Sequence, residues 1–197
     1  MGLGLVHFSL SVVALFWIAF VVVFSVNHAR VRRRRGVEDA SARRNDLRAP
    51  VSMLGLLLEG VAIGILFVFR RPLEAVSGVE AAAAMVIAPA SVLLSWYALR
   101  HLGQQWRVKA VVTEGHELVT TGPYRLVRHP IFLSLFGMAL ATALLITQWA
   151  AIVAAVLVYI VGTEIRIRAE DRILLERFGE KFRRYQHAVP AYLPFLR

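Results

Sequence analysis

Two polar clusters in this sequence contain residue types that can perform chemistry, and both lie beside long apolar segments. The first is the run from His116 to Phe132, which holds two His, two Arg, one Tyr and two Thr in a segment interrupted by Gly and Pro. The second consists of Arg166, Glu170 and Asp171, which follow the last apolar stretch. Polar groups beside a membrane segment are costly to desolvate, and they are by default candidates for function. These two clusters therefore form the candidate site.

The residue types favour the binding of a charged ligand over metal or nucleophilic chemistry. The sequence has no Cys, which rules out disulfides, thiolate ligands and a Cys nucleophile. His116 and His129 lack the helical spacing of a zinc pair, so no metal site is predicted. An acid and an Arg at one helix end, facing a loop with His, Tyr and free backbone donors, can hold a zwitterionic ligand. The acid would bind an ammonium group and the loop a carboxylate and a ribose, with an apolar hairpin beside them for a lipid-like second substrate.

Each cluster also has a purely structural interpretation. Arg166 and Glu170 are four residues apart and share a helix face, where an exposed ion pair contributes under about 1 kcal/mol. His129 can serve only as the cap of the helix that follows it, and Tyr124 only as an anchor at the membrane interface. The functional interpretation depends on the two clusters lying together.

The elements that must position these clusters are apolar helices. Hydrophobic residues make up 58% of the 197-residue chain. Three apolar stretches, Leu3 to Val26, Val51 to Phe69 and Ala81 to Leu99, are long enough to cross a bilayer core of about 30 Å. A fourth, Ile131 to Gly162, is broken by a polar turn at 147–149 and predicts a tight hairpin of two helices that are short or tilted. We therefore expect an all-α, polytopic integral membrane protein with about five transmembrane helices.

The basic residues predict the orientation of these helices. Nearly all of the 23 Lys and Arg fall in three regions, Arg30 to Arg48, Arg100 to Arg128 and Arg166 to Arg197, and only Arg70 and Arg71 lie elsewhere. Five crossings place the three regions on one side, which the positive-inside rule makes cytoplasmic. We expect the N-terminus outside and the C-terminus and active site in the cytoplasm. The net charge of +10 then indicates contact with anionic membrane lipids, and no nucleic-acid partner is expected.

Breaker residues predict the local structure around the two clusters. Gly and Pro keep residues 115–123 from forming a helix, and Pro130 begins the next one. The last apolar helix continues as a charged segment until Gly179, a natural helix stop. Residues 180–187 can form a short amphipathic helix on the cytoplasmic membrane surface. Residues 111–113 have strand propensity but are too few to build a sheet.

Glu59 is an acid about two turns inside the second apolar stretch. An intramembrane acid is a functional candidate by default. The sequence leaves open whether Glu59 takes part in chemistry or only faces a neighbouring helix or the lipid headgroups.

Two motifs give the C-terminal half a family resemblance. The string His-x-Leu-Val-Thr-x-Gly-x-Tyr-x-x-x-Arg-His-Pro begins at His116, and Phe-Gly-x-x-Phe-x-x-Tyr-x-x-x-Val-Pro-x-x-Leu-Pro begins at Phe178. With the apolar hairpin and the acidic pair between them, they closely resemble the isoprenylcysteine carboxyl methyltransferase family, which is related to the membrane phospholipid N-methyltransferases. The resemblance covers residues 102–195. It implies that residues 101–197 are a methyltransferase core with a cofactor loop, a helical hairpin and C-terminal cytoplasmic helices. Residues 1–100 would add three transmembrane helices and a basic cytoplasmic loop.

The resemblance implies S-adenosylmethionine as the cofactor and assigns roles to individual residues. Glu170 would bind the amino group of the cofactor, and Arg166, as the catalytic residue, would hold the substrate carboxylate near the methyl group. Arg128 would support the loop. The residues implied to bind the cofactor are His116, Glu117, Leu118, Val119, Tyr124, His129, Pro130, Ile131, Phe132 and Glu170.

The sequence departs from the family where Phe132 and Phe182 replace the usual Tyr. These replacements weaken the assignment of the substrate more than the assignment of the cofactor. Carboxyl O-methylation of an isoprenylcysteine-like or isoprenoid acid is the function that the resemblance favours. A phospholipid-type N-methyltransferase, a non-catalytic membrane protein of the same fold and a sterol-reductase-like enzyme with a nicotinamide cofactor are the alternatives. The expected partners are a lipophilic or lipidated substrate and membrane lipids, and the oligomeric state is left open.

Overall fold

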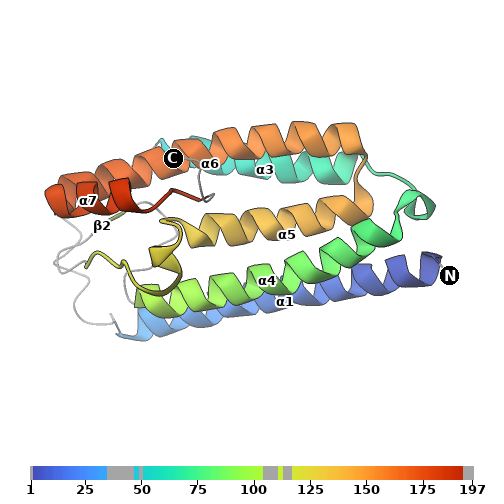
Figure 1. Ribbon diagram of the computed structural model, residues 1–197, viewed down its shortest axis with the longest axis horizontal. Coiled ribbons are helices and arrows are strands. Elements are labelled where there is room, and N and C mark those ends of the chain that lie inside the picture. The colour runs from blue at the N-terminus through green and yellow to red at the C-terminus, as the bar shows by residue number, and fades with distance from the viewer. Residues whose placement is uncertain (1, 35–46, 49–50, 104–110, 113–116, 193–197) are drawn as a thin grey trace.

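Five long helices run back and forth along one axis of the protein (Figure 1). The computed structural model describes residues 2–34, 47–48, 51–103, 111–112 and 117–192. The short α7 and the 3-10 turns η1 and η3 complete the helical elements of this part of the chain. In chain order the helices are α1 (Gly2–Arg34), α3 (Ser52–Val68), η1 (Leu73–Ala75), α4 (Gly78–Leu102), η3 (Gly122–Arg125), α5 (Pro130–Ile146), α6 (Trp149–Phe178) and α7 (Glu180–Ala188).

The helices pack as two pairs with α5 between them. Helix α3 lies along α6 on one side, α1 lies along α4 on the other, and α5 is in the middle (Figure 1). The start of α1 lies at one end of the bundle, and α7 lies at the opposite end with η3 and the start of α5. The expected all-α architecture with five long helices and a C-terminal hairpin is confirmed.

The lengths of the helices differ in part from the expectation. Three of them, Leu3–Arg33, Gly78–Leu102 and Trp149–Phe178, are long and apolar enough to cross a membrane. Helices α3 and α5 are apolar but only 17 residues long, about 25 Å at the standard helical rise. Of the last two helices only α5 is short. Helix α6 has 30 residues, because its charged C-terminal turns continue the apolar segment without a break until Gly179, whose φ is 51°.

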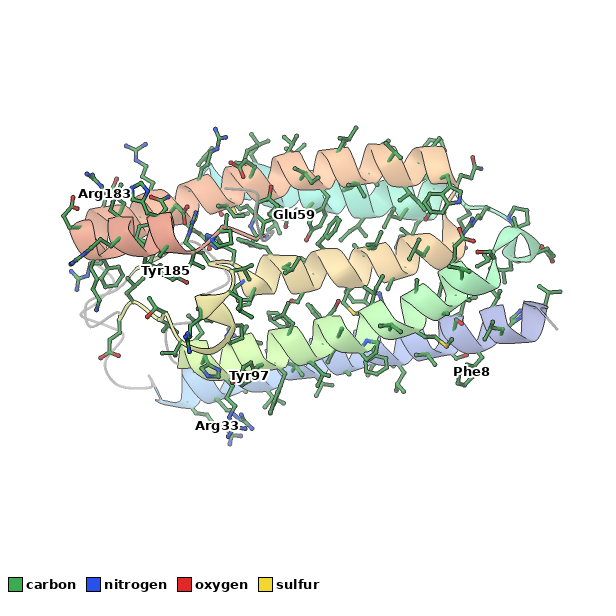
Figure 2. The ribbon with its side chains drawn as sticks, in the orientation of Figure 1. Phe8, Arg33, Glu59, Tyr97, Arg183 and Tyr185 are labelled. Atoms are coloured by element: carbon green, nitrogen blue, oxygen red, sulfur yellow. The ribbon has the colours of Figure 1, made fainter. Side chains whose placement is uncertain are left out.

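Large apolar side chains cover the outside of this bundle as well as its interior. Val6, Met138 and Leu145 are buried in a core shared by α1, α4 and α5. In contrast, Phe8, Ile18 and many other large apolar residues point outward (Figure 2 labels Phe8). An apolar exterior along the helices is expected where lipid tails are the solvent.

The structure also contains a minimal β-ladder that the sequence argument did not anticipate. Strand β1 (Leu47–Arg48) pairs antiparallel with β2 (Val111–Val112) through two residue pairs. The partner strand comes from the connection between α1 and α3, so the pairing could not be inferred from the residues around Val111 alone.

Two glycines bring the backbones of α3 and α6 into direct contact. A Cβ at Gly55 would lie 2.5 Å from the carbonyl oxygen of Gly162 and 2.5 Å from Cγ of Arg166. A Cβ at Gly162 would lie 2.7 Å from the carbonyl oxygen of Gly55. Small residues allow this close approach of membrane helices. Glu59, one turn beyond Gly55, and Thr163, the residue after Gly162, are thereby brought face to face.

This crossing predicts that Gly55→Ala destabilises the protein, because the methyl group would overlap the backbone of α6. We expect a loss of about 1–3 kcal/mol, typical of overpacking. The matched control is Gly60→Ala in the same helix, where a Cβ meets nothing within 4 Å. Thermal unfolding of both variants in detergent measures the difference, and equal melting temperatures would contradict the close crossing.

Candidate active site

A buried ion pair joins α3 to α6 beside the glycine crossing. Nη1 of Arg166 donates to Oε2 of Glu59 at 2.5 Å, and Oγ1 of Thr163 donates to Oε1 of Glu59 at 3.0 Å. Both charged side chains are buried, and only 2% of the Glu59 side chain is exposed. Each carboxylate oxygen of Glu59 therefore has its own donor on α6.

The guanidinium of Arg166 is also held against the start of α5. Its Cζ lies 4.4 Å from the centre of the Phe132 ring, within the range of a cation–π contact. Its Nε is buried and has no hydrogen-bond partner among the described residues. Arg166 is thus fixed on two sides and still has a donor to offer.

His129, which immediately precedes α5, faces two acids of α6. Its Nε2 lies 3.0 Å from Oδ1 of Asp171, and its Nδ1 lies 3.4 Å from Oε2 of Glu170. Burial alone would disfavour the charged imidazolium, but hydrogen bonds to Asp171 and Glu170 and their negative charges outweigh it and raise the pKa of His129 to about 9. The ring stacks on Phe132 with 5.6 Å between ring centres, so His129 and Arg166 contact the same aromatic ring. At neutral pH the site therefore contains an imidazolium with acids on both of its nitrogens.

Arg128 fastens this cluster to the C-terminal segment. Its Nη2 donates to Oδ2 of Asp171 at 2.9 Å, and its Nη1 donates to the carbonyl oxygens of Gln186 and Val189. The backbone N–H groups of residues 128 and 129 donate to the carbonyl oxygens of residues 190 and 191. The expectation that Arg128 supports the loop is consistent with these contacts.

Helix α7 holds the preceding turn in place in the same way. The hydroxyl of Tyr185 donates to the carbonyl oxygen of Tyr124 at 2.6 Å (Figure 2 labels Tyr185). Burial, followed by the nearby Tyr185 and Glu170, raises the pKa of the Tyr124 phenol, so Tyr124 is neutral at physiological pH. Tyr124 is buried, which does not fit a role as an interfacial anchor only.

The structure brings four of the predicted site residues into one cluster, namely Arg166, His129, Phe132 and Glu170. The remaining ones lie near it or outside it. Pro130 and Tyr124 are buried, Ile131, Leu118 and Val119 are half-buried, Glu117 is exposed, and His116 lies outside the described residues. Residues 117–119 belong to no helix or strand. Their backbone groups are therefore not committed to regular secondary structure.

The purely structural interpretations of the two clusters, an exposed ion pair between Arg166 and Glu170 and a helix cap at His129, are wrong. Arg166 and Glu170 do not pair with each other, because Arg166 is drawn to Glu59 on α3 and Glu170 to His129. His129 occupies the N-cap position of α5, yet its side chain makes no capping hydrogen bond.

Sequence reasoning left Glu59 undecided, placed Asp171 in the acidic cluster without giving it a role, and did not place Thr163 or Gln186 in the site. Asp171 accepts hydrogen bonds from three side chains, including that of Gln186 at 3.1 Å. The intramembrane acid was the one available signal for Glu59. The role of Gln186 depends on the fold of α7 back onto α6, which no residue spacing reveals.

An apolar crevice runs between α3, α5 and α6 next to the buried ion pair. Tyr159, which belongs to it, lies one turn of α6 before Thr163. The other residues that line it are Ala62, Ile63, Leu66, Phe136, Ala139, Leu140, Ala143, Ala155 and Val156.

These features define a polytopic helical membrane protein with a charged site at one end of its helix bundle. Residues 82–176 match the sequence model of the Isoprenylcysteine carboxyl methyltransferase (ICMT) family. The predicted resemblance is confirmed, and this segment carries the signature of that family. It contains α5, most of α4 and α6, and the site residues His129, Arg166 and Glu170.

Comparison with individual proteins gives the same result. The chain is 32% identical over 109 residues to the Protein-S-isoprenylcysteine O-methyltransferase of Saccharomyces cerevisiae, covering 48% of this chain and 46% of the yeast protein. It is 33% identical over 84 residues to the Uncharacterized protein YpbQ of Bacillus subtilis, covering 43% of this chain and 50% of that protein. The chain thus matches about half the length of these curated relatives.

A solved structure shares the fold over most of the chain. It is the eukaryotic intramembrane Ras methyltransferase ICMT, solved without a monobody, with a TM-score of 0.56 and 19% sequence identity. The match covers 93% of this chain and 68% of the other. Together with its long apolar helices, this shared fold supports an integral membrane protein.

The buried network predicts a large effect of Asp171→Asn. The substitution keeps the shape of the side chain but leaves buried Arg128 without a counter-charge and His129 with Glu170 alone, which we expect to reduce stability by about 3–5 kcal/mol. Glu176→Gln is the control, since its partner Arg172 is exposed and the pair contributes under about 1 kcal/mol. Thermal unfolding of both variants measures the difference, and similar losses would contradict the network.

The raised pKa of His129 predicts a pH-dependent stability. Relative to the unfolded value near 6.5, a folded pKa of about 9 gives stabilisation that is fully present below about pH 6.5 and lost as the pH rises to about 9. His129→Gln should therefore unfold at a lower temperature than the wild type at pH 6 and converge with it above about pH 9. The exposed His187→Gln should follow the wild type. A difference for His129→Gln that does not change with pH would show that the ring is neutral.

Proposed function

We propose that this chain is a membrane methyltransferase that uses S-adenosylmethionine to esterify the carboxylate of a lipophilic acceptor, an isoprenylcysteine-like or isoprenoid acid. The family match over residues 82–176 carries the proposal. The geometry supports it, because Arg166, His129 and Glu170 meet around Phe132 at the end of the bundle.

The donor set of the site fits this cofactor. The side chain of Glu170 is 28% exposed, whereas that of Asp171 is 7% exposed and fully engaged by Arg128 and His129. Glu170 can therefore bind an ammonium group, with His129 as its anchor. The uncommitted backbone of residues 117–119 is available to further polar groups of the ligand. When bound, S-adenosylmethionine supplies a methyl group attached to a positively charged sulfur.

Arg166 acts on the acceptor. A carboxylate is already ionised at neutral pH, so the reaction needs no general base and depends on alignment and exclusion of water. The acceptor oxygen forms a bond to the methyl carbon as the carbon–sulfur bond breaks with its electrons on sulfur, and no proton moves. The free donor Nε of Arg166 can orient the carboxylate, and the Phe132 ring shields one face of the guanidinium from water.

The lipid part of the acceptor would meet an apolar helix surface near this arginine. The crevice between α3, α5 and α6 is lined almost entirely by apolar side chains and lies next to the Glu59–Arg166 pair. The crevice holds only about 20 Å³ of free volume, so an isoprenoid chain would pack along its mouth against these helices and gain van der Waals contacts relative to the surrounding lipid.

The charge distribution supports a cytoplasmic site. The three basic regions lie at the ends of the helices that the positive-inside rule assigns to the cytoplasm. Helix α7, η3 and the start of α5 share that end of the bundle (Figure 1). The N-terminus would then face the opposite side.

The proposal predicts that the product is an alkali-labile methyl ester and that its formation depends on Arg166. The purified protein should transfer labelled methyl from S-adenosylmethionine to an S-farnesylated cysteine acid, and base should release the label as methanol. We expect Arg166→Lys to lower kcat about 100-fold or more while cofactor affinity is kept, because the planar fork that orients the carboxylate is lost.

Arg172→Ala, which alters an exposed arginine of the same helix, should leave the rate unchanged. Base-stable label would indicate N-methylation, and no transfer to any acid or amine acceptor would contradict enzymatic function.

A further inference from the structure

Glu59 stands apart from the rest of the site because it lies outside the segment that matches the family, on α3. An ionised acid at this depth is strongly disfavoured unless it is paired. Its position follows from the glycine crossing, which places it one turn beyond Gly55 and directly against Arg166 and Thr163. Figure 2 labels Glu59 on α3.

The pair creates an electrostatic arrangement that a lone arginine would not have. An unpaired guanidinium beside an apolar crevice would hold an acceptor carboxylate tightly, since charges interact strongly where water is excluded. Tight binding of the negative charge stabilises the ground state, and it is lost when the carboxylate becomes a neutral ester. Interactions of this kind improve binding without raising the rate of the chemical step.

We propose that Glu59 is the positioning residue of Arg166 and offsets its charge, so that the arginine orients the acceptor carboxylate without quenching its nucleophilicity. This inference rests on the proposed function and deepens it. Oε2 of Glu59 fixes the Nη1 end of the guanidinium, Phe132 fixes its face, and Nε is left free for the acceptor. Thr163 fixes the second oxygen of Glu59, so the carboxylate cannot rotate away.

The test compares Glu59→Gln with the wild type for an S-farnesylated cysteine acid and for its methyl ester. The amide keeps an acceptor for Arg166 but removes the negative charge. We expect the acid to bind about tenfold more tightly and kcat to fall about tenfold, while the affinity for the uncharged ester is unchanged. Binding is measured by tryptophan fluorescence and turnover by methyl transfer, both per folded protein.

The matched control is Glu80→Gln. Glu80 forms the other buried Arg–Glu pair of the described bundle, with Arg71 at 2.7 Å, at the end where α4 begins. Both substitutions should lower stability, but Glu80→Gln should leave the ratio of acid to ester affinity and kcat unchanged. If Glu59→Gln does not fold, Glu59→Asp draws the charge away from Arg166 and should shift the ratio in the same direction by a smaller factor.

The outcomes separate this inference from the proposed function. If the wild type methylates the acid and Glu59→Gln shows the same affinity ratio and kcat, the role of Glu59 is wrong and the function stands. If acid affinity falls together with ester affinity, Glu59 serves only to hold the fold. If the wild type neither methylates nor binds the acid, the proposed function and the inference both fail.

Discussion

Within the described bundle every buried charge is paired with an opposite charge from another element, and these pairs determine how the helices can sit. An unpaired charge in such surroundings would cost several kcal/mol, so any shift of one helix that separated a pair would destabilise the fold. Two of the three sets meet at the end that carries the candidate site, and the third closes the opposite end. The sets are Glu59 with Arg166, Arg128 and His129 with Asp171, and Arg71 with Glu80.

The same pairing explains why the site can be polar beside a membrane segment. The glycine contact between α3 and α6 puts Glu59 on Arg166, and α7 folds back to supply Gln186 and backbone carbonyls to Arg128 and Asp171. Phe132 then separates the arginine from the histidine while touching both. Stability and binding thus depend on the same few side chains.

Much of this could be predicted from the sequence, and the limits have physical causes. Apolar runs and their breakers give the five helices, the hairpin, the start of α5 at Pro130 and the end of α6 at Gly179, because these signals are local. The partner of Arg166 could not be predicted, since spacing along α6 favours Glu170 while the glycine crossing supplies Glu59 from about a hundred residues earlier. The apolar part of α6 alone suggests a short helix, and only the charged turns up to Gly179 account for its 30 residues. Roles of His116 to Val119 remain predictions.

The direct test of a charged cofactor site formed by these pairs is calorimetric titration of the purified protein with S-adenosylmethionine and, separately, with a reduced nicotinamide cofactor. We expect saturable binding of S-adenosylmethionine that is lost in Glu170→Ala and His129→Ala, and no binding of the nicotinamide. Saturable binding of the nicotinamide would contradict the account in favour of a reductase. Binding of neither would leave a non-catalytic membrane protein of the same fold.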